Sequence, residues 1–427
     1  MKKQFLFIFF LMVSVCMRAQ FSGKGSGTKD DPYLITTANE LNQTRNNLEA
    51  CYKLMRDIDL TEWLSENNPS QGWMPIGAKN EPFKGKFDGN GKTVKLFINR
   101  PDQEYVGFMG VVSCATIKKL TVKGNITGKT AVGGIIGCSS PYCEIEDCHY
   151  VGNVNGGGIV GEMSSTGIST VKNCSFTGKA EAGIVYRCEM VKIQGCKVNA
   201  TIESESDAGG IIGIISPGKY SERKYPGSKE WVDYFSEVHD CSVSGHIKGK
   251  NAGGIVGSSA ALNVYNNLIT ADVEGTNAGG ILGGEYEYSK VYIAYTSITK
   301  NVIASAEIKG TNSVGRVSGT PDATCGNIGS LSTNYVINSL CFYLDGQKQT
   351  TSDNPQNGEI CGKSVLAESA TYEGLGWDMR KTWGMSSVTD LPYLLCMGEN
   401  AGADDETASP DNYDNTLMLG DLTTAAG

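Results

Sequence analysis

A glycine-rich heptad recurs along the chain and constrains the fold more than any other feature. From Asn251 the sequence reads NAGGIVG, and from Asn277 it reads NAGGILG. Self-similarity at a nearly fixed period is typical of architectures in which each repeat stacks on the next. Further copies read AVGGIIG from Ala131, NGGGIVG from Asn155, a shortened EAGIVY from Glu181, DAGGIIG from Asp207 and a degenerate NSVGRVSG from Asn312.

A second motif, with a cysteine or polar residue at its centre, comes before the heptads. A short run such as GHIKG from Gly245 separates the two motifs. Three short strands per repeat form one coil of an all-β solenoid, because stacking buries apolar faces that a single coil leaves exposed. The second motif reads IEDCHYVG from Ile145, VKNCSFTG from Val171, IQGCKVNA from Ile193, VHDCSVSG from Val238, VYNNLITA from Val264 and IAYTSITK from Ile293.

Stacking of the coils predicts ladders of equivalent side chains about 4.8 Å apart. One inward ladder consists of Ile135, Ile159, Ile184, Ile211, Ile255 and Ile281. A second consists of Cys148, Cys174, Cys196 and Cys241, continued by Asn267 and Thr296. Free cysteine packs as a small hydrophobe, so we interpret this ladder as a thiol stack, with disulfides or a metal site as alternatives. The redox state of Cys138, Cys143, Cys325, Cys341 and Cys361 stays open.

The heptad glycines have a structural interpretation. We expect Gly253 and Gly254 to allow a bend at positive φ and a close approach of neighbouring coils. A different glycine-rich stretch, from Gly85 to Thr93, reads GKFDGNGKT and nearly imitates a phosphate-binding loop. Its glycines are wrongly spaced and a strand pattern follows, so we predict a hairpin-type turn there.

Composition excludes some classes of protein. The 427 residues include 54 glycines and only 19% charged residues, which disfavours a helical protein. Formal net charge is −9, and the acidic segment 398–427 contains no Lys or Arg. Nucleic-acid binding is therefore not expected, because it needs clustered cations.

The first twenty residues, MKKQFLFIFFLMVSVCMRAQ, have the pattern of a secretory signal peptide cleaved near Ala19. Cys16 offers an alternative as a lipid-attachment residue, although Val15 before it is bulkier than a lipobox usually carries. No other segment is long and apolar enough for a membrane helix. We expect an extracytoplasmic protein, secreted or held at the outer-membrane surface.

The pattern divides the chain into five parts. Residues 1–20 form the signal peptide, 21–104 an N-terminal cap with the first coils, 105–320 the repeats, 321–397 a C-terminal cap, and 398–427 a disordered acidic tail. Thr37 to Leu48 reads as a short capping helix, with Thr37 and Glu40 at capping-box spacing. Trp377 and Trp383 belong to the distal cap.

Two insertions carry most of the candidate binding residues. One lies between Ile215 and Val238, and another begins at Gly284. Insertions of a repeat protein often map to its binding face, where aromatic planes stack on sugars or anchor a protein partner. The alternative is that these aromatics only hold their own loops. The candidate ligand-binding residues are Tyr220, Tyr225, Trp231, Tyr234, Tyr286 and Tyr288, with Phe235 and Tyr292 beside them.

Motifs for catalysis are weak. The three histidines, His149, His239 and His246, lie in repeat strands without an HExxH motif, which excludes a zinc protease of that type. Asp57 and Asp59 share a strand face, as a general acid and a general base of a polysaccharide-cleaving enzyme would. An exposed polar face of the strand explains them equally well. Acidic turns at Asp88 or Asp207 lack a calcium-loop pattern. The sequence therefore predicts no catalytic residue, no metal ligand and no cofactor.

In this order the motifs resemble the GLUG-repeat family of bacterial surface proteins, whose repeats also occur in immunoglobulin-A-specific metalloproteases. The resemblance covers roughly residues 25–398, from GTKDDPYLI through WMPIG and FKGKFDGNGKTV to YEGLGWDMRKTW and LPYL. It implies a right-handed parallel β-helix with an adhesin-like role, in Bacteroidales, and carries over no catalytic residue. The insertion from Ser216 to Ser236 and the worn heptads at Ala182 and Val314 depart from the pattern.

Three functional hypotheses follow. The first is an adhesin-like binding protein that presents loops on a rigid β-helix to a glycan or a host or matrix protein. The second is a polysaccharide lyase or glycoside hydrolase on the same scaffold. The third is a structural spacer or assembly subunit.

Overall fold

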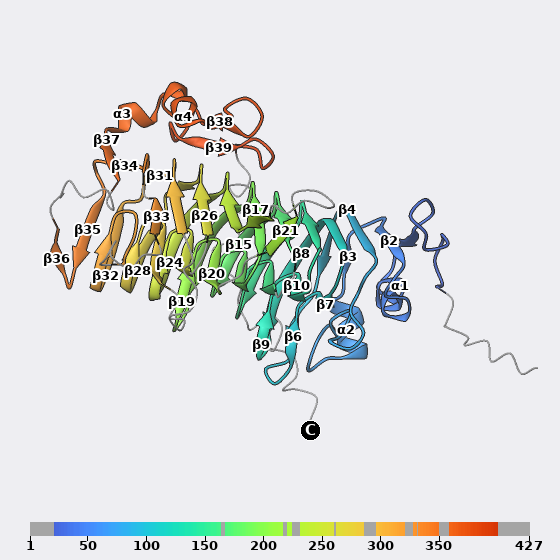
Figure 1. Cartoon of the computed structure of the whole chain (residues 1–427). Coiled ribbons are helices and arrows are strands. Elements are labelled where there is room, and N and C mark those ends of the chain that lie inside the picture. The colour runs from blue at the N-terminus through green and yellow to red at the C-terminus, as the bar shows by residue number, and fades with distance from the viewer. Residues whose placement is uncertain are drawn as a thin grey trace, which may run out of the picture.

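The structure is a computed structural model that describes residues 21–163, 167–216, 220–223, 231–259, 262–285, 296–320, 328–330, 332–349 and 358–399. Its described part is dominated by β-strands, most of them in two long sheets of parallel strands that run side by side (Figure 1). Successive strands in each sheet are one coil apart in the sequence, as the repeats predict. The architecture is therefore β-helix-like.

The smaller of these sheets is built from the strands that follow the heptad isoleucines. Adjacent strands of this sheet pair in parallel and in register, for example Ile136 with Val160 and Ile212 with Val256. The order is β29-β25-β20-β16-β13-β10-β7. The strands are β7 (Met109–Val112), β10 (Ile136–Ser139), β13 (Val160–Met163), β16 (Val185–Cys188), β20 (Ile212–Ile215), β25 (Val256–Ser259) and β29 (Leu282–Glu285).

The larger sheet holds the two other strands of each coil. Those before the cysteine position are β11 (Glu144–Glu146), β14 (Ser169–Lys172), β17 (Val191–Gln194), β23 (Ser236–His239), β26 (Leu262–Tyr265), β30 (Thr296–Thr299) and β33 (Ile328–Ser330). Those after it are β12 (His149–Val154), β15 (Ser175–Ala180), β18 (Lys197–Glu203), β19 (Asp207–Gly209), β24 (Ser242–Gly253), β27 (Leu268–Ile269), β28 (Asp272–Gly279), β31 (Val302–Ile303), β32 (Glu307–Gly315), β34 (Tyr335–Ile337), β35 (Cys341–Leu344) and β37 (Glu359–Cys361). In earlier coils β4 (Lys86–Lys95) and β8 (Thr116–Thr127) run through both positions.

The chain bends between these two positions at a residue with left-handed backbone geometry. Asp147, Asn173, Asp240 and Asn266 have φ between 52° and 57°, and Gly195 has φ 67°. Asn and Asp tolerate this region better than other residues with a side chain. The polar residue before each ladder cysteine therefore sets the corner of the coil.

The cysteine ladder is confirmed, but its continuation beyond Asn267 is not Thr296. Thr296 pairs with Leu262, and the ladder continues through Asn301 and Asn334. The coil between Leu262 and Thr296 contains an insertion, so alignment by residue type slipped by five positions. Asn267 Nδ2 donates to Asn301 Oδ1 at 2.9 Å, and Asn301 Nδ2 donates to Asn334 Oδ1 at 2.9 Å. A stack of buried amides thus replaces the thiols in the later coils.

The isoleucine ladder is also confirmed. Ile211 N donates to the Ile255 carbonyl at 2.9 Å, and Ile255 N donates to the Ile281 carbonyl at 3.0 Å. All six isoleucine side chains are buried, and Val317 of the degenerate heptad continues the row. These side chains form the central part of one continuous core.

The close approach at the heptad glycines is confirmed, whereas their expected positive φ is wrong. Neither Gly253 nor Gly254 lies in the left-handed region. A Cβ on Gly254 would lie 2.0 Å from the carbonyl oxygen of Gly280, its counterpart in the next coil. Positive φ occurs instead in another row, at Gly152 and Gly178, where φ is 145° and 140°.

The N-terminal part covers the first coils. Its capping box is confirmed, since Glu40 N donates to Thr37 Oγ1 at 3.2 Å and Thr37 N donates to Glu40 Oε2 at 3.0 Å. The α-helix ends at Gln43 rather than Leu48, and a 3₁₀ turn, η1 (Thr44–Asn46), follows. Its other elements are β1 (Tyr33–Ile35), α1 (Ala38–Gln43), β2 (Cys51–Leu54), β3 (Ile58–Asp59), α2 (Thr61–Asn67), β5 (Ile98–Asn99), β6 (Glu104–Val106) and β9 (Thr130–Val132).

The stretch from Gly85 to Thr93 is not a hairpin. It lies in β4, which pairs in parallel with β2 and β3. The chain bends at Asn90 and Gly91, which have φ 52° and 70°, and Asn90 N donates to Asp88 Oδ1 at 2.8 Å. The glycine-rich turn pattern therefore marks a corner within a coil, where the chain bends between two parallel strands.

The C-terminal segment 363–397 packs along a side face of the stack, and not only over its last coil as the expected distal cap would (Figure 1). Trp377 Nε1 donates to the Lys300 carbonyl at 2.8 Å, and Trp383 Nε1 donates to Asp240 Oδ1 at 3.1 Å. Beneath the segment lie Leu268 and Val302. Its elements are α3 (Lys363–Leu366), α4 (Ser369–Leu375), β38 (Trp383–Met385) and β39 (Pro392–Leu394).

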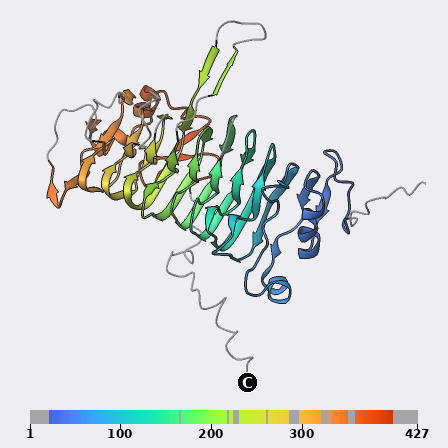
Figure 2. The same ribbon diagram turned by 60° about the horizontal axis from the view of Figure 1, so that its bottom comes forward.

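The first insertion forms an antiparallel hairpin of β21 (Tyr220–Arg223) and β22 (Trp231–Tyr234), which stands out from the stack (Figure 2). A second short hairpin joins β36 (Gln347–Lys348) to β35 near the last coil.

In the part of the chain that the structure describes, no helix is long and apolar enough to cross a membrane.

Candidate functional site

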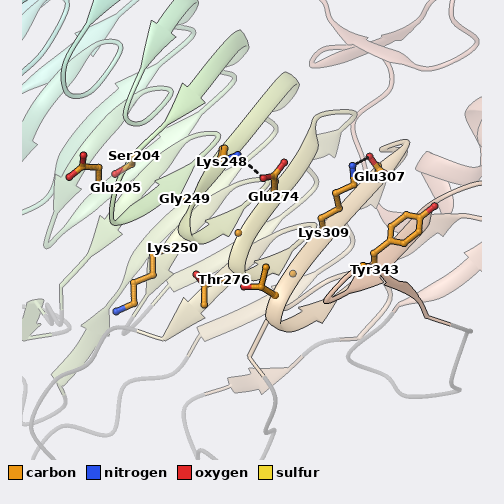
Figure 3. A pocket seen from close by; sticks show the side chains of 14 residues that line it. Ser204, Glu205, Lys248, Gly249, Lys250, Glu274, Thr276, Glu307, Lys309 and Tyr343 are labelled. Carbon is orange, nitrogen blue, oxygen red and sulfur yellow. Dashed lines mark hydrogen bonds and ion pairs between the residues drawn. The ribbon is translucent and has the colours of Figure 1, made fainter.

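A groove of about 910 Å³ crosses the outer surface of β24, β28, β32 and β35 (Figure 3). Its lining is polar and charged, with glycine backbone between the side chains. The residues that line it are Ser204, Glu205, Lys248, Gly249, Lys250, Glu274, Gly275, Thr276, Glu307, Lys309, Gly310, Thr311, Tyr343 and Gly346.

The charged side chains of the groove come from one outward-facing row of the sheet. In register, Lys248 lies opposite Glu274, Glu274 opposite Lys309, and Lys309 opposite Tyr343. Each of them follows a buried residue, because alternate residues of a strand point to opposite faces. The stacking of coils therefore places a lysine, a glutamate, a lysine and a tyrosine side by side.

Two short ion pairs hold the charges in place. Lys248 Nζ lies 2.6 Å from Glu274 Oε1, and Lys309 Nζ lies 2.6 Å from Glu307 Oε2. The hydrogen bond from Lys248 lowers the pKa of Glu274, and the same bond raises the pKa of Lys248. The hydrogen bond to Glu307 likewise raises the pKa of Lys309. Lys248, Glu274 and Lys309 are thus charged near neutral pH.

The remaining side chains leave polar groups open to a ligand. Lys250 is exposed, and among the described residues its ammonium has no ion-pair partner. Thr276 and Thr311 occupy the equivalent position in the next two coils and are also exposed. Hydroxyl and ammonium groups in this setting donate hydrogen bonds to whatever the groove holds.

A row of amides fixes the wall of the groove. Asn251 Nδ2 donates to Asp207 Oδ1 at 2.6 Å, and Asn277 Nδ2 donates to Asn251 Oδ1 at 2.7 Å. Asn312 Nδ2 continues the row to Asn277 Oδ1 at 2.9 Å. Lys250, Thr276 and Thr311 immediately precede these asparagines in the sequence, so the amide row holds their backbone in place.

The loop aromatics predicted as ligand-binding residues cannot be placed in this groove. Tyr220, Trp231 and Tyr234 belong to the strands of the β21–β22 hairpin. The structure describes the backbone of these three residues but not their side chains. Tyr225, Tyr286 and Tyr288, with Tyr292, also lie outside the described residues, whereas Phe235 is half-buried beside β23.

Sequence reasoning missed the groove, although a signal was present. The three stretches HIKGKN, DVEGTN and EIKGTN share one pattern: a buried aliphatic residue, a charge, a glycine, a polar residue and an asparagine. Two of them run directly into a regular heptad, and the third into the degenerate one. Earlier coils, such as TIESESD, do not have this pattern.

The other candidate residues have structural roles. Asp59 is half-exposed and accepts a hydrogen bond from Thr61 while it pairs with Lys95 at 3.1 Å. Partial burial raises the pKa of Asp59, but hydrogen bonds from Thr61 and Lys95 outweigh it and lower the pKa overall. Asp57 Oδ1 accepts from Thr93 N at 2.7 Å. Both carboxylates therefore stabilise the local backbone and the pairing of neighbouring strands.

Histidine and cysteine do not form a metal centre in the described part of the chain. His149 contacts Ser175 Oγ at 2.8 Å, and His239 contacts Asp240 Oδ2 at 2.8 Å. Across the described residues no group of three or more His, Cys, Asp or Glu side chains is placed to hold a metal ion. The described cysteines are free thiols, including Cys138, Cys143, Cys341 and Cys361; Cys325 lies outside the described residues.

Comparison with known proteins gives partial likenesses. No family model matches the chain. A candidate glycine-rich membrane protein of Evansella cellulosilytica is 39% identical over 121 residues, which are 27% of this chain and 14% of that protein. Halomucin of Haloquadratum walsbyi is 30% identical in an alignment of 156 positions that covers 29% of this chain and 2% of halomucin. The chain thus spans a small fraction of both relatives.

Two solved structures are similar in outline. A candidate immunoglobulin A1 protease from Bacteroides ovatus matches with a TM-score of 0.48 and 18% identity, over 87% of this chain and 94% of that one. A structure described as IgA1 protease matches with a TM-score of 0.48 and 12% identity, over 79% of this chain and 24% of that one.

Proposed function

We propose that this protein is an extracytoplasmic, adhesin-like binding protein of the GLUG-repeat type that holds an extended glycan in the groove over β24, β28, β32 and β35. The observation that carries the proposal is the outward row of Lys248, Glu274, Lys309 and Tyr343 on a rigid stack of strands. Ion pairs and an aromatic ring at fixed spacing are the groups with which proteins bind sugars: polar groups contact hydroxyls, and the ring packs on a pyranose face.

The proposal includes three features that come from the sequence. These are export through the signal peptide 1–20, display as a secreted or surface protein, and right-handed winding of the coils, which parallel crossovers adopt almost without exception. Signal-peptide residues 1–20 lie outside the described residues. The description of one relative as a membrane protein supports a location at the cell envelope.

Binding fits the groove better than polysaccharide cleavage does. A general acid needs a pKa raised toward the working pH, and a general base needs an accessible lone pair. Glu274 has a lowered pKa and shares its carboxylate with Lys248, while Glu307 is paired with Lys309. These carboxylates are arranged as fixed charges, which suits recognition.

The test is binding of the purified ectodomain to immobilised glycans, comparing Tyr343→Ala with Tyr142→Ala. Tyr142 is an exposed tyrosine of an early coil outside the groove. We expect Tyr343→Ala to weaken binding about tenfold or more and Tyr142→Ala to leave it unchanged, because truncation of an aromatic hot spot in a binding site costs about 2 kcal/mol or more. Equal effects of both variants would contradict the groove as the site.

The hairpin is a second proposed ligand contact, separate from the groove. Trp231→Ala is then expected to weaken binding without lowering the melting temperature, because β22 stands out from the stack (Figure 2). Binding that is unchanged in Trp231→Ala would remove the hairpin from the proposal and leave the groove.

A further inference from the structure

The direction of the groove follows from the coils that line it. Ser204, Lys248, Glu274, Lys309 and Tyr343 come from five successive positions along the stack. Neighbouring parallel strands are about 4.8 Å apart, so the groove is about 19 Å long across the strands. An extended ligand that fills it must therefore lie along the axis of the stack, perpendicular to the strands.

The net charge of the groove is zero. Its carboxylates are Glu205, Glu274 and Glu307, and its ammonium groups are Lys248, Lys250 and Lys309. A polyanion placed along the axis would meet three carboxylates, and a polycation would meet three ammonium groups. Like-charge contacts of this kind oppose binding, and they act against either type of polymer. Charge complementarity therefore favours a neutral ligand.

Neutral sugars match the alternation of charges. A sugar hydroxyl both donates and accepts hydrogen bonds, so it contacts a carboxylate or an ammonium group equally well. Hydrogen bonds to charged partners are about twice as strong as those between neutral groups. Because a lysine, a glutamate and a lysine follow one another from coil to coil, a sugar at each of these three coils meets one charged group, at a spacing close to the length of one pyranose unit.

We propose that the groove binds a neutral linear polysaccharide along the stack axis, with about one sugar per coil and with Tyr343 as a stacking platform at one end. This inference rests on the proposed glycan-binding function and specifies its ligand class. Lys250, which has no ion-pair partner among the described residues, contributes a donor at the rim. The alternating ion pairs keep the wall rigid and the net charge at zero.

The first experiment measures affinity for neutral β-linked glucan, mannan and xylan beside polygalacturonate and chitosan, at about 0.1 M and about 1 M salt. We expect at least one neutral polymer to bind, with an affinity that changes less than about twofold between the two salt concentrations, because no charged ligand is screened. Binding only of a charged polymer, with strong salt dependence, would overturn this inference and leave the proposed function. Binding of no polysaccharide would overturn both.

The second experiment varies ligand length and groove charge. With oligosaccharides of two to about six sugars, affinity is expected to rise up to about four sugars and then level off, as the groove length requires. Lys250→Glu is expected to give the groove affinity for chitosan that Lys129→Glu, an exposed lysine of an early coil, does not give. Affinity that levels off at two sugars would contradict the axial direction, and identical behaviour of the two lysine variants would contradict the role of groove charge.

Discussion

At the residue scale, one row of glycines controls how closely the coils approach. A Cβ on Gly183 would lie 1.8 Å from the Gly210 carbonyl oxygen, and one on Gly210 would lie 2.1 Å from that of Gly254. In the last described heptad Arg316 takes the place of glycine, and its guanidinium lies 5.5 Å from the ring centroid of Phe342. Glycine is therefore needed where another heptad strand stacks against the position, and the worn heptad marks the end of the row.

Gly254→Ala tests this requirement. We expect it to lower the free energy of unfolding by about 2–3 kcal/mol, because the added methyl group meets the Gly280 carbonyl at 2.0 Å. Gly374→Ala is the control, since a methyl group added in helix α4 at this position would have no atom from outside the helix within 4 Å. The control is expected to be neutral or to stabilise by up to about 1 kcal/mol. Denaturant titrations that give both variants the same midpoint would contradict the account.

The buried thiols predict a loss of stability at alkaline pH. Burial raises the pKa of Cys148, Cys174 and Cys196 well above the ordinary value of 9.0. Below pH 9 the thiols are protonated in both the folded and the unfolded chain, so their protonation does not change the free energy of unfolding. Above pH 9 the unfolded chain releases thiol protons that the folded chain retains, so the free energy of unfolding falls, by up to about 4 kcal/mol per pH unit for three thiols.

Denaturant unfolding between pH 7 and pH 10 measures this slope. Burial also raises the pKa of Cys143, Cys188, Cys361 and Cys396. Cys174→Ser removes one titrating group and is therefore expected to reduce the slope by that group's share, about 1.4 kcal/mol per pH unit. Burial also raises the pKa of Tyr52 and Tyr372, but these phenols titrate at higher pH, above the ordinary value of 10.0. A stability that does not change from pH 8 to pH 10 would show that the thiols release their protons equally in the folded and the unfolded chain, so that burial does not raise their pKa.

At the scale of elements, one outward row of the large sheet explains where the C-terminal segment docks. The row is polar at Thr121, His149 and Ser175 and becomes apolar at Leu268 and Val302. The segment 363–397 lies over the apolar part, with Trp377 and Trp383 among the residues that cover it. The two aromatic rings pack at a centroid distance of 4.7 Å.

Leu268→Asp is expected to release the segment. A carboxylate buried beneath Trp377 and Trp383 without a partner costs roughly 3 kcal/mol or more. Hydrogen exchange should then show lost protection over 363–397 while the strands of the stack remain protected. Thr121→Asp, in the same row but outside the covered part, is the control and should leave the pattern unchanged. Loss of protection throughout the chain would instead show that the segment and the stack unfold as one unit.

At the scale of the whole molecule, the coils behave as interchangeable layers. Asn251 lies in register with Asn277, 26 residues later, and β24, β25 and β26 pair in turn with β28, β29 and β30 of the next coil. The stability of such a stack is close to a sum of coil and neighbour contributions. The same regularity makes the groove a property of several coils, because no single coil contains more than a part of it.

Deletion of residues 251–276 removes one coil in register. The shortened protein is expected to keep its β-sheet circular dichroism and to bind long oligosaccharides more weakly, because the groove loses about 4.8 Å. Deletion of 251–275 is the comparison: it leaves one extra residue at the place where β28 and β32 already pair through a one-residue bulge, so we expect that protein to fold with lower stability than the in-register deletion. Equal stability of the two deletions would contradict the assigned register.

The amino-acid sequence by itself determined the repeating part of this protein: the coils, the inward isoleucine and cysteine rows, and the capping box at Thr37 and Glu40. These features depend on neighbours along the chain and on a constant period. Tertiary structure alone decided the continuation of the cysteine row at Asn301, the docking of segment 363–397, and the row of Lys248, Glu274, Lys309 and Tyr343. Each of these depends on which residues of different coils lie side by side, and insertions of unequal length hide that register from a reading along the chain.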